Sequence, residues 1–191
     1  MTRGSFCHAE VLFKFTKEEW KKQLLAFDKN YGIIGTRAKS LWARIDAISE
    51  GVSDNEELAL CFYTIWGSRL SVRLLNEYDD YIFNRLPDKE FTKTLSMSFS
   101  AEEIRHCLAF SIQELEKAYD SYKALTYFLP PALIRRPVTP ALPNKYFCSE
   151  FICYMFHQLG YLKDTVPEKV TPNHLPALYD ILEEQLKLKH G

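Results

Sequence analysis

The 191-residue sequence lacks any long uncharged apolar run and carries almost no net charge. A membrane-spanning helix needs about 18 or more consecutive apolar residues, and the longest uncharged runs, such as residues 151–162, are shorter. With 24 basic and 25 acidic residues the formal net charge is −1, so the basic surface of a nucleic-acid-binding protein is not expected. We therefore expect no transmembrane segment and no nucleic-acid partner.

The sequence also lacks the features of a secreted or metal-binding chain. Charged residues interrupt the N-terminal stretch where a signal peptide would be apolar. The five cysteines are odd in number and scattered, unlike the disulfide framework of a small secreted domain. No Cys-x-x-Cys pair or zinc-type His/Cys spacing occurs. We expect a cytoplasmic protein with reduced thiols, no metal and no organic cofactor.

What the sequence does contain is enough apolar material for one core. Of its residues 47% are apolar and 14% aromatic, and domains typically have roughly 100–200 residues, so residues 1–191 are expected to form a single domain. The order of hydrophobic patterns is strand, helices, strands, helix, loop and helix, which predicts an α+β fold.

The expected elements follow from periodicity and capping signals. Thr16–Glu19 and Ser100–Glu103 have the pattern of capping boxes, in which the first and fourth residues satisfy each other's backbone donors at a helix start. Five prolines make residues 130–143 a loop. Strands are predicted over Ser5–Phe15, Leu58–Trp66 and Leu70–Leu75, and helices after Thr16, over Arg37–Ile48, from Ser100 to about Tyr119, from Phe147 to Gly160 and over Leu178–Leu188.

Cys148 has the position expected of a nucleophile. It lies at the predicted start of a helix, directly after the proline-rich loop. A helix N-terminus offers unpaired N–H groups and a partial positive charge, which stabilise a thiolate. The alternative is that Cys148 is a small core residue, as free cysteine often is. Position alone leaves both interpretations open.

His8 is the candidate base for Cys148. In an extended chain His8 and Glu10 point to the same face, and a Cys–His pair needs a third group that orients the imidazole. Two residues along a strand lie about 6.5–7 Å apart, an awkward reach for a glutamate. Tyr63 or Thr64 on a neighbouring strand is therefore an alternative to Glu10, and a purely structural histidine is an alternative to a base.

Several short motifs occur in one order along most of the chain. They are Gly4-Ser-Phe-Cys-His8-Ala-Glu10, Cys61–Trp66, Tyr119–Asp120, Tyr146-Phe-Cys148-Ser-Glu150 and Thr171-Pro-Asn-His-Leu175. Together they resemble the circularly permuted NlpC-type papain-like thiol hydrolases. That group includes YiiX-like bacterial proteins, the lecithin-retinol acyltransferase branch and proteins of large viruses. In the permuted branch the histidine strand precedes the cysteine helix, as it does here.

The resemblance implies a permuted papain-like fold, with a small antiparallel sheet carrying His8 packed against the helix of Cys148. Residues 16–57 exceed a simple strand connection and are expected to form a helical insertion over the site. The implied activity is cysteine-dependent hydrolysis of an amide or ester, peptidase- or amidase-like, on a peptide, amide or lipid-ester substrate. Cys148 would be the nucleophile, His8 the base and Glu10 the orienting residue.

Two other functions fit the same fold. One is a non-catalytic binding module, for example a viral protein that acts on host partners. The other is lipid acyl transfer, but that branch has a further histidine shortly after the first, and here none follows His8 until His106.

Overall fold

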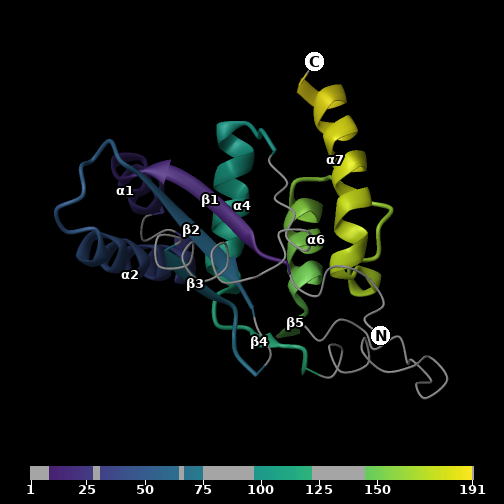
Figure 1. Ribbon diagram of the computed structural model, residues 1–191, viewed down its shortest axis with the longest axis horizontal. Helices are drawn as coiled ribbons and strands as arrows, with labels where there is room; N and C mark the ends of the chain where they lie inside the picture. Colours follow the sequence, from purple (N-terminus) through teal and green to yellow (C-terminus); the bar gives the residue numbers. More distant parts are fainter. Residues whose placement is uncertain (1–8, 28–30, 65–66, 75–96, 122–144, 191) are drawn as a thin grey trace, which may run out of the picture.

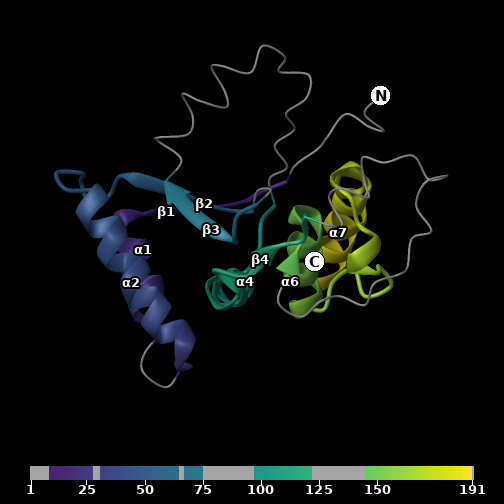
Figure 2. The ribbon, with the colours of Figure 1, turned by 90° about the horizontal axis from the view of Figure 1, so that it is seen from below.

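The computed structural model describes residues 9–27, 31–64, 67–74, 97–121 and 145–190. These residues form an α+β fold with a three-stranded antiparallel sheet, a short parallel strand pair and five α-helices (Figures 1 and 2). The elements are β1 (Val11–Thr16), α1 (Lys17–Leu25), α2 (Ile33–Ile48), β2 (Glu57–Tyr63), β3 (Ser71–Leu74), α4 (Ala101–Glu114), β4 (Ala118–Tyr119), β5 (Lys145–Tyr146), α6 (Cys148–Gln158) and α7 (Leu175–His190), with 3₁₀ turns at Pro167–Lys169 and Pro172–His174.

The main sheet has the strand order β1-β2-β3, and its register separates two faces. Val11 pairs with Phe62 and Cys61 pairs with Arg73. Because side chains alternate along a strand and paired residues share a face, the odd residues of β1 and the even residues of β2 face the hydrophobic core. Cys61 and Arg73 lie on the opposite face, which we call the outer face of the sheet.

Helices α1 and α2 form between β1 and β2, within the range where a helical insertion was predicted. The apolar stripe of these helices packs into the main core: Trp20, Leu24, Ala38, Leu41 and Ile45. In both views the pair lies at one end of the molecule and α6 at the other, with α4 between them (Figures 1 and 2). The expectation that this insertion covers Cys148 is therefore wrong, because the apolar face of α1 and α2 packs against the sheet and α4.

Helices α4 and α6 complete the main core on the inner face of the sheet. Their contact is made by apolar residues of both helices, and Phe110 and Phe151 stack with ring centroids 5.7 Å apart. Helix α7 closes a second, smaller cluster with Tyr161, Leu162, Leu182 and Leu186. No helix of the described ranges combines the length and apolarity that a bilayer crossing requires.

Most predicted helix boundaries agree with the structure, but α2 begins at Ile33 rather than at Arg37, and the end of α4 also differs. Both predicted capping boxes are present, and Gly160 follows α6 with φ +81°, which only glycine adopts easily. Helix α4 ends at Glu114 rather than near Tyr119, because Leu115 leaves the helical region and Tyr119 pairs with Tyr146 in a parallel strand pair. Residues 5–8 of the first predicted strand and the predicted loop 130–143 lie outside the described residues.

Glu103 links the start of α4 to the end of α7. Its carboxylate accepts hydrogen bonds from the Ser100 backbone and hydroxyl, from the Tyr161 hydroxyl at 2.5 Å and from Lys189 at 2.7 Å, and it lies 3.0 Å from His190 Nε2. Burial alone would raise the pKa of this carboxyl, but the hydrogen bonds from Lys189, Tyr161 and Ser100 outweigh burial and hold the pKa well below its usual range.

Replacing Glu103 by glutamine should lower the free energy of unfolding by about 2 kcal/mol at pH 7, because the amide keeps one acceptor but loses the charge-assisted bonds. A carboxyl with a lowered folded-state pKa stabilises the fold above its unfolded value of about 4.3, and this contribution is lost as the pH falls through the folded value. Urea unfolding should therefore show the gap between the two proteins narrowing below pH 4. Exposed Glu102→Gln is the control, with a change of about 0.5 kcal/mol or less; equal stabilities of Glu103→Gln and wild type at pH 7 would contradict the prediction.

Candidate functional site

The N-terminus of α6 is held in place by its own first turn and by the chain that follows the helix. Phe147 is extended, and its backbone N–H donates to Glu150 Oε2 at 3.0 Å. The Ser149 hydroxyl donates to the Val170 carbonyl at 2.8 Å, and both Ser149 and Glu150 are buried. Cys148 is the first residue of the helix, as the sequence predicted. A helix start leaves the first backbone N–H groups without partners inside the helix. These N–H groups can donate hydrogen bonds to an acceptor that lies near Cys148.

The chain just before β1 packs against the N-terminus of α6. Phe147 and Cys148 form a small buried cluster against which Ala9 and Tyr119 pack, with the Tyr119 and Phe147 rings 5.9 Å apart. His8, the predicted base, lies outside the described residues. Its sequence neighbour Ala9 packs against the Phe147–Cys148 cluster.

The Cys148 thiol is enclosed, with 1% of the residue exposed. Cys61, Cys107 and Cys153 are also buried, and none of these three forms a disulfide with another described cysteine. Burial raises the pKa of Cys107 to about 12, and burial together with the Glu10 carboxylate raises the pKa of Cys61 still further. Those two thiols therefore stay protonated at neutral pH and serve as internal standards for unreactive cysteine.

Glu10, the predicted orienting residue, has charged and polar partners that sequence reasoning missed. Its Oε1 lies 3.0 Å from Arg73 Nη2, and its Oε2 accepts a hydrogen bond from the Cys61 thiol at 3.0 Å. The Arg73 guanidinium also lies over the Tyr63 ring, 4.1 Å from its centroid. The sequence offered the imidazolium of His8 as the nearest charged partner of Glu10, whereas the structure gives Glu10 the guanidinium of Arg73.

Glu10 and Ala9 contact opposite faces of the main sheet. Ala9 packs against the core and against Cys148, whereas Cys61 and Arg73, the partners of Glu10, are on the outer face. This is the alternation expected of adjacent residues in an extended chain. Glu10 thus approaches the sheet from the side that Cys148 does not occupy.

Of the two alternative orienting residues, Thr64 has the better placement. Tyr63 lies under Arg73 on the outer face. Thr64 is on the inner face, and continuing the β1–β2 register by two residues would place it opposite Ala9. Its hydroxyl is buried and has no hydrogen-bond partner in the part of the chain that the structure describes. The Thr64 hydroxyl can therefore form a hydrogen bond with a donor or acceptor that lies near Ala9.

Tyrosine–glutamate pairs fix the elements around Cys148. The Tyr146 hydroxyl donates to Glu114 Oε2 at 2.5 Å, Lys117 pairs with the same carboxylate, and the Tyr154 hydroxyl donates to Glu168. Burial and the hydrogen-bonded carboxylates raise the pKa of Tyr146 and of Tyr154 far above the usual phenol value. These phenols remain neutral donors, and they tie β5 and α6 to their neighbours.

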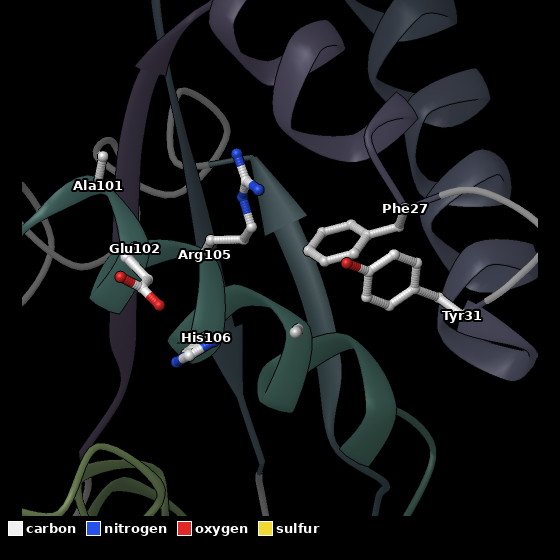
Figure 3. A pocket seen from close by; sticks show the side chains of 7 residues that line it. Phe27, Tyr31, Ala101, Glu102, Arg105 and His106 are labelled. Atoms are coloured by element: carbon white, nitrogen blue, oxygen red, sulfur yellow. The ribbon is translucent and has the colours of Figure 1, made fainter.

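A separate hollow lies on the other side of α4 (Figure 3). It has a volume of about 400 Å³ and is lined by Phe27, Tyr31, Ala101, Glu102, Arg105, His106 and Ala109. His106 is exposed there, whereas Cys107 beside it is buried. None of the lining residues comes from β1, β5 or α6, so this hollow is distinct from the surroundings of Cys148.

Within the described ranges, no group of three or more His, Cys, Asp and Glu side chains is placed to hold a metal ion. No protein-family model matches the chain. No curated protein and no solved structure matches it either.

Proposed function

We propose that this protein is a cysteine-dependent hydrolase of an amide or ester bond, with a permuted papain-like fold, Cys148 as its nucleophile and His8 as its base. The observation that carries the proposal is the packing of Ala9 against the Phe147–Cys148 cluster. Ala9 is the neighbour of His8 in sequence, and Cys148 is the first residue of α6. For His8 to act on Cys148, the chain must leave the extended conformation before Ala9, since an extended chain would put His8 on the outer face with Glu10. The order of motifs, histidine first and cysteine last, supports the same assignment.

In the proposed reaction His8 takes the proton of the Cys148 thiol, and the thiolate adds to the substrate carbonyl carbon. The backbone N–H of Cys148 donates to the oxyanion, in the way that a helix start stabilises negative charge. The imidazolium of His8 then protonates the leaving amine or alcohol, which leaves an acyl-enzyme. Water, deprotonated by His8, attacks the thioester carbonyl, the acid product departs and the thiol regains its proton.

A non-catalytic binding module on the same fold is the second candidate function. The observation that favours it is the burial of Cys148, which is 1% exposed and packs with Phe147, Ala9 and Tyr119. Free cysteine with such neighbours is the ordinary core residue. The two functions differ in whether the Cys148 thiol reacts in the folded protein.

Alkylation of the native protein tests the choice. With iodoacetamide at pH 7, read by peptide mass spectrometry, Cys148 should react about tenfold or more faster than Cys61 and Cys107, because under the proposal only Cys148 has a general base to take the thiol proton. Cys153, which is buried in the same helix, controls for local opening of α6. His8→Ala should bring Cys148 down to the rate of the other cysteines. If all four rates are equal in the wild type, Cys148 is a packing residue and the binding module is the better proposal.

A further inference from the structure

We propose that the hollow beside α4 is a binding site for a small aromatic carboxylic acid, in which Arg105 binds the carboxylate and the aromatic ring packs against Phe27 and Tyr31. The site is separate from the surroundings of Cys148, since none of its lining residues comes from β1, β5 or α6. Binding there is a property additional to the proposed hydrolase activity, and its test does not involve Cys148.

The first support is the size and shape of the hollow. Its volume of about 400 Å³ lies within the range of small-molecule pockets, about 300–1,000 Å³. Phe27 follows α1 and Tyr31 precedes α2, and their rings lie across the hollow from α4 (Figure 3). On α4, Ala101, Arg105 and Ala109 are spaced by four residues and form one row. The two alanines have only methyl side chains, so they leave space beside Arg105 in both directions along the helix.

The second support is the aromatic side of the hollow. The Phe27 and Tyr31 rings meet edge-on, with centroids 5.4 Å apart and an interplanar angle of 83°. Phe27 is 1% exposed and belongs to the main core, so its ring is held in place, whereas Tyr31 is 48% exposed and offers open ring surface. Aromatic rings prefer offset-stacked or edge-to-face contacts with one another. A planar aromatic ligand can therefore add a third ring to this pair.

The third support is that the polar side chains of the lining are available to a ligand. Four of them have no hydrogen-bond or ion-pair partner within the described ranges: Tyr31, Glu102, Arg105 and His106. Arg37, by contrast, donates to the carbonyls of the last turn of α4. A guanidinium can form two parallel hydrogen bonds with one carboxylate. Arg105 can therefore bind a carboxylate in the hollow without giving up a contact within the protein.

The charges of the lining favour a carboxylate over a phosphate. Arg105 supplies a permanent positive charge, and the His106 ring can donate a further hydrogen bond in either protonation state. Glu102 lies one turn before His106 on the same helix and adds a negative charge to the lining. A ligand with one negative charge meets less repulsion from Glu102 than a phosphate with two.

Titration with three related probes, followed by two-dimensional NMR of the labelled full-length protein, tests the site. Indole-3-carboxylate is a planar aromatic acid, indole-3-carboxamide is its neutral analogue, and phenyl phosphate carries more negative charge. The carboxylate should bind the wild type with a Kd of about 1 mM or lower and shift the backbone amide signals of residues 101–109. The carboxamide and phenyl phosphate should each bind about tenfold or more weakly.

Three variants locate the bound probe. Arg105→Gln should weaken binding of indole-3-carboxylate about tenfold or more, because the charge-assisted hydrogen bonds are lost. Tyr31→Ala should weaken it about threefold or more, because one ring of the aromatic side is removed. Arg44→Gln is the matched control, since Arg44 is an exposed arginine of α2 outside the lining, and it should leave the affinity unchanged. Arg105 and Tyr31 are themselves exposed, so both test variants should fold.

Several outcomes would overturn the proposal. Absence of saturable shifts at residues 101–109 with indole-3-carboxylate would remove the site itself. Equal affinities for the acid and its carboxamide would remove the role of Arg105, and tighter binding of phenyl phosphate would replace the carboxylate by a phosphate. An Arg105→Gln protein that binds the acid as tightly as Arg44→Gln would place the probe outside the hollow.

Discussion

Replacing Cys148 by alanine should remove the proposed turnover of activated esters such as p-nitrophenyl acetate, with a loss of about 10³-fold or more, because the proposed acyl-enzyme forms on the Cys148 sulfur. The folded state should be little affected. The change removes one buried sulfur, and a loss of that size costs about 1 kcal/mol. The measurement is the rate of p-nitrophenolate release, together with the mass of the acylated protein after a single exposure to the ester.

The matched control for this variant is Cys153→Ala, which removes a second buried thiol from the same helix. Cys153→Ala should keep the acylation rate within about twofold of the wild-type rate, and its free energy of unfolding should fall by about as much as that of Cys148→Ala. His8→Ala should lower the rate by about 10²-fold or more, as expected for loss of a general base. If Cys148→Ala is acylated as fast as the wild type, the nucleophile is elsewhere and the hydrolase proposal fails.

The largest expected loss of stability comes from Trp20. Its side chain is fully buried, its ring meets Phe15 edge-on at 4.8 Å, and its Nε1 donates to the Leu58 carbonyl at 2.8 Å. Trp20→Ala should lower the free energy of unfolding by about 3–5 kcal/mol, since it opens a large cavity. Trp20→Phe fills most of the space but leaves the buried carbonyl without its donor, which costs about 1–3 kcal/mol.

Urea unfolding followed by circular dichroism measures both Trp20 variants. Trp42→Phe is the control because Trp42 is only partly buried against the core, and it should change the free energy of unfolding by less than about 1 kcal/mol. The order wild type, Trp20→Phe, Trp20→Ala is the result that tests the helix–sheet contact. A Trp20→Ala protein as stable as Trp20→Phe would mean that α1 contributes little to the core.

Local sequence signals predicted the elements whose causes are local. The capping boxes at Thr16 and Ser100, the helix start at Cys148 and the glycine after α6 are each set by residues within one turn of the chain. The α+β class and the alternation that separates Glu10 from Ala9 follow from periodicity alone. The prediction that Cys148 begins a helix beside the first strand's entry rests on these signals and on the family resemblance.

The features that sequence reasoning missed depend on partners far away in the chain. Arg73 is 63 residues from Glu10, and nothing near Arg73 indicates which strand will lie beside it until the register is known. The pair β4–β5 consists of two residues in each strand, too few for a hydrophobic period, so α4 was expected to run through it. The position of α1 and α2 depends on which apolar surface of the sheet is not already covered by other helices. That is determined by the packing of the whole core and not by the local sequence.

The opposite facing of Ala9 and Glu10 constrains insertions and deletions near the N-terminus. Because the side-chain period of a strand is two, one residue inserted between Glu10 and the first paired residue, Val11, would move Glu10 from the outer face to the inner face. The Glu10 carboxylate would then lie on the side of the Phe147–Cys148 cluster, and the guanidinium of Arg73 would lose its acidic partner. The register of β1 therefore sets the side chains on both faces of the sheet, and a one-residue change of length at this point would misplace both.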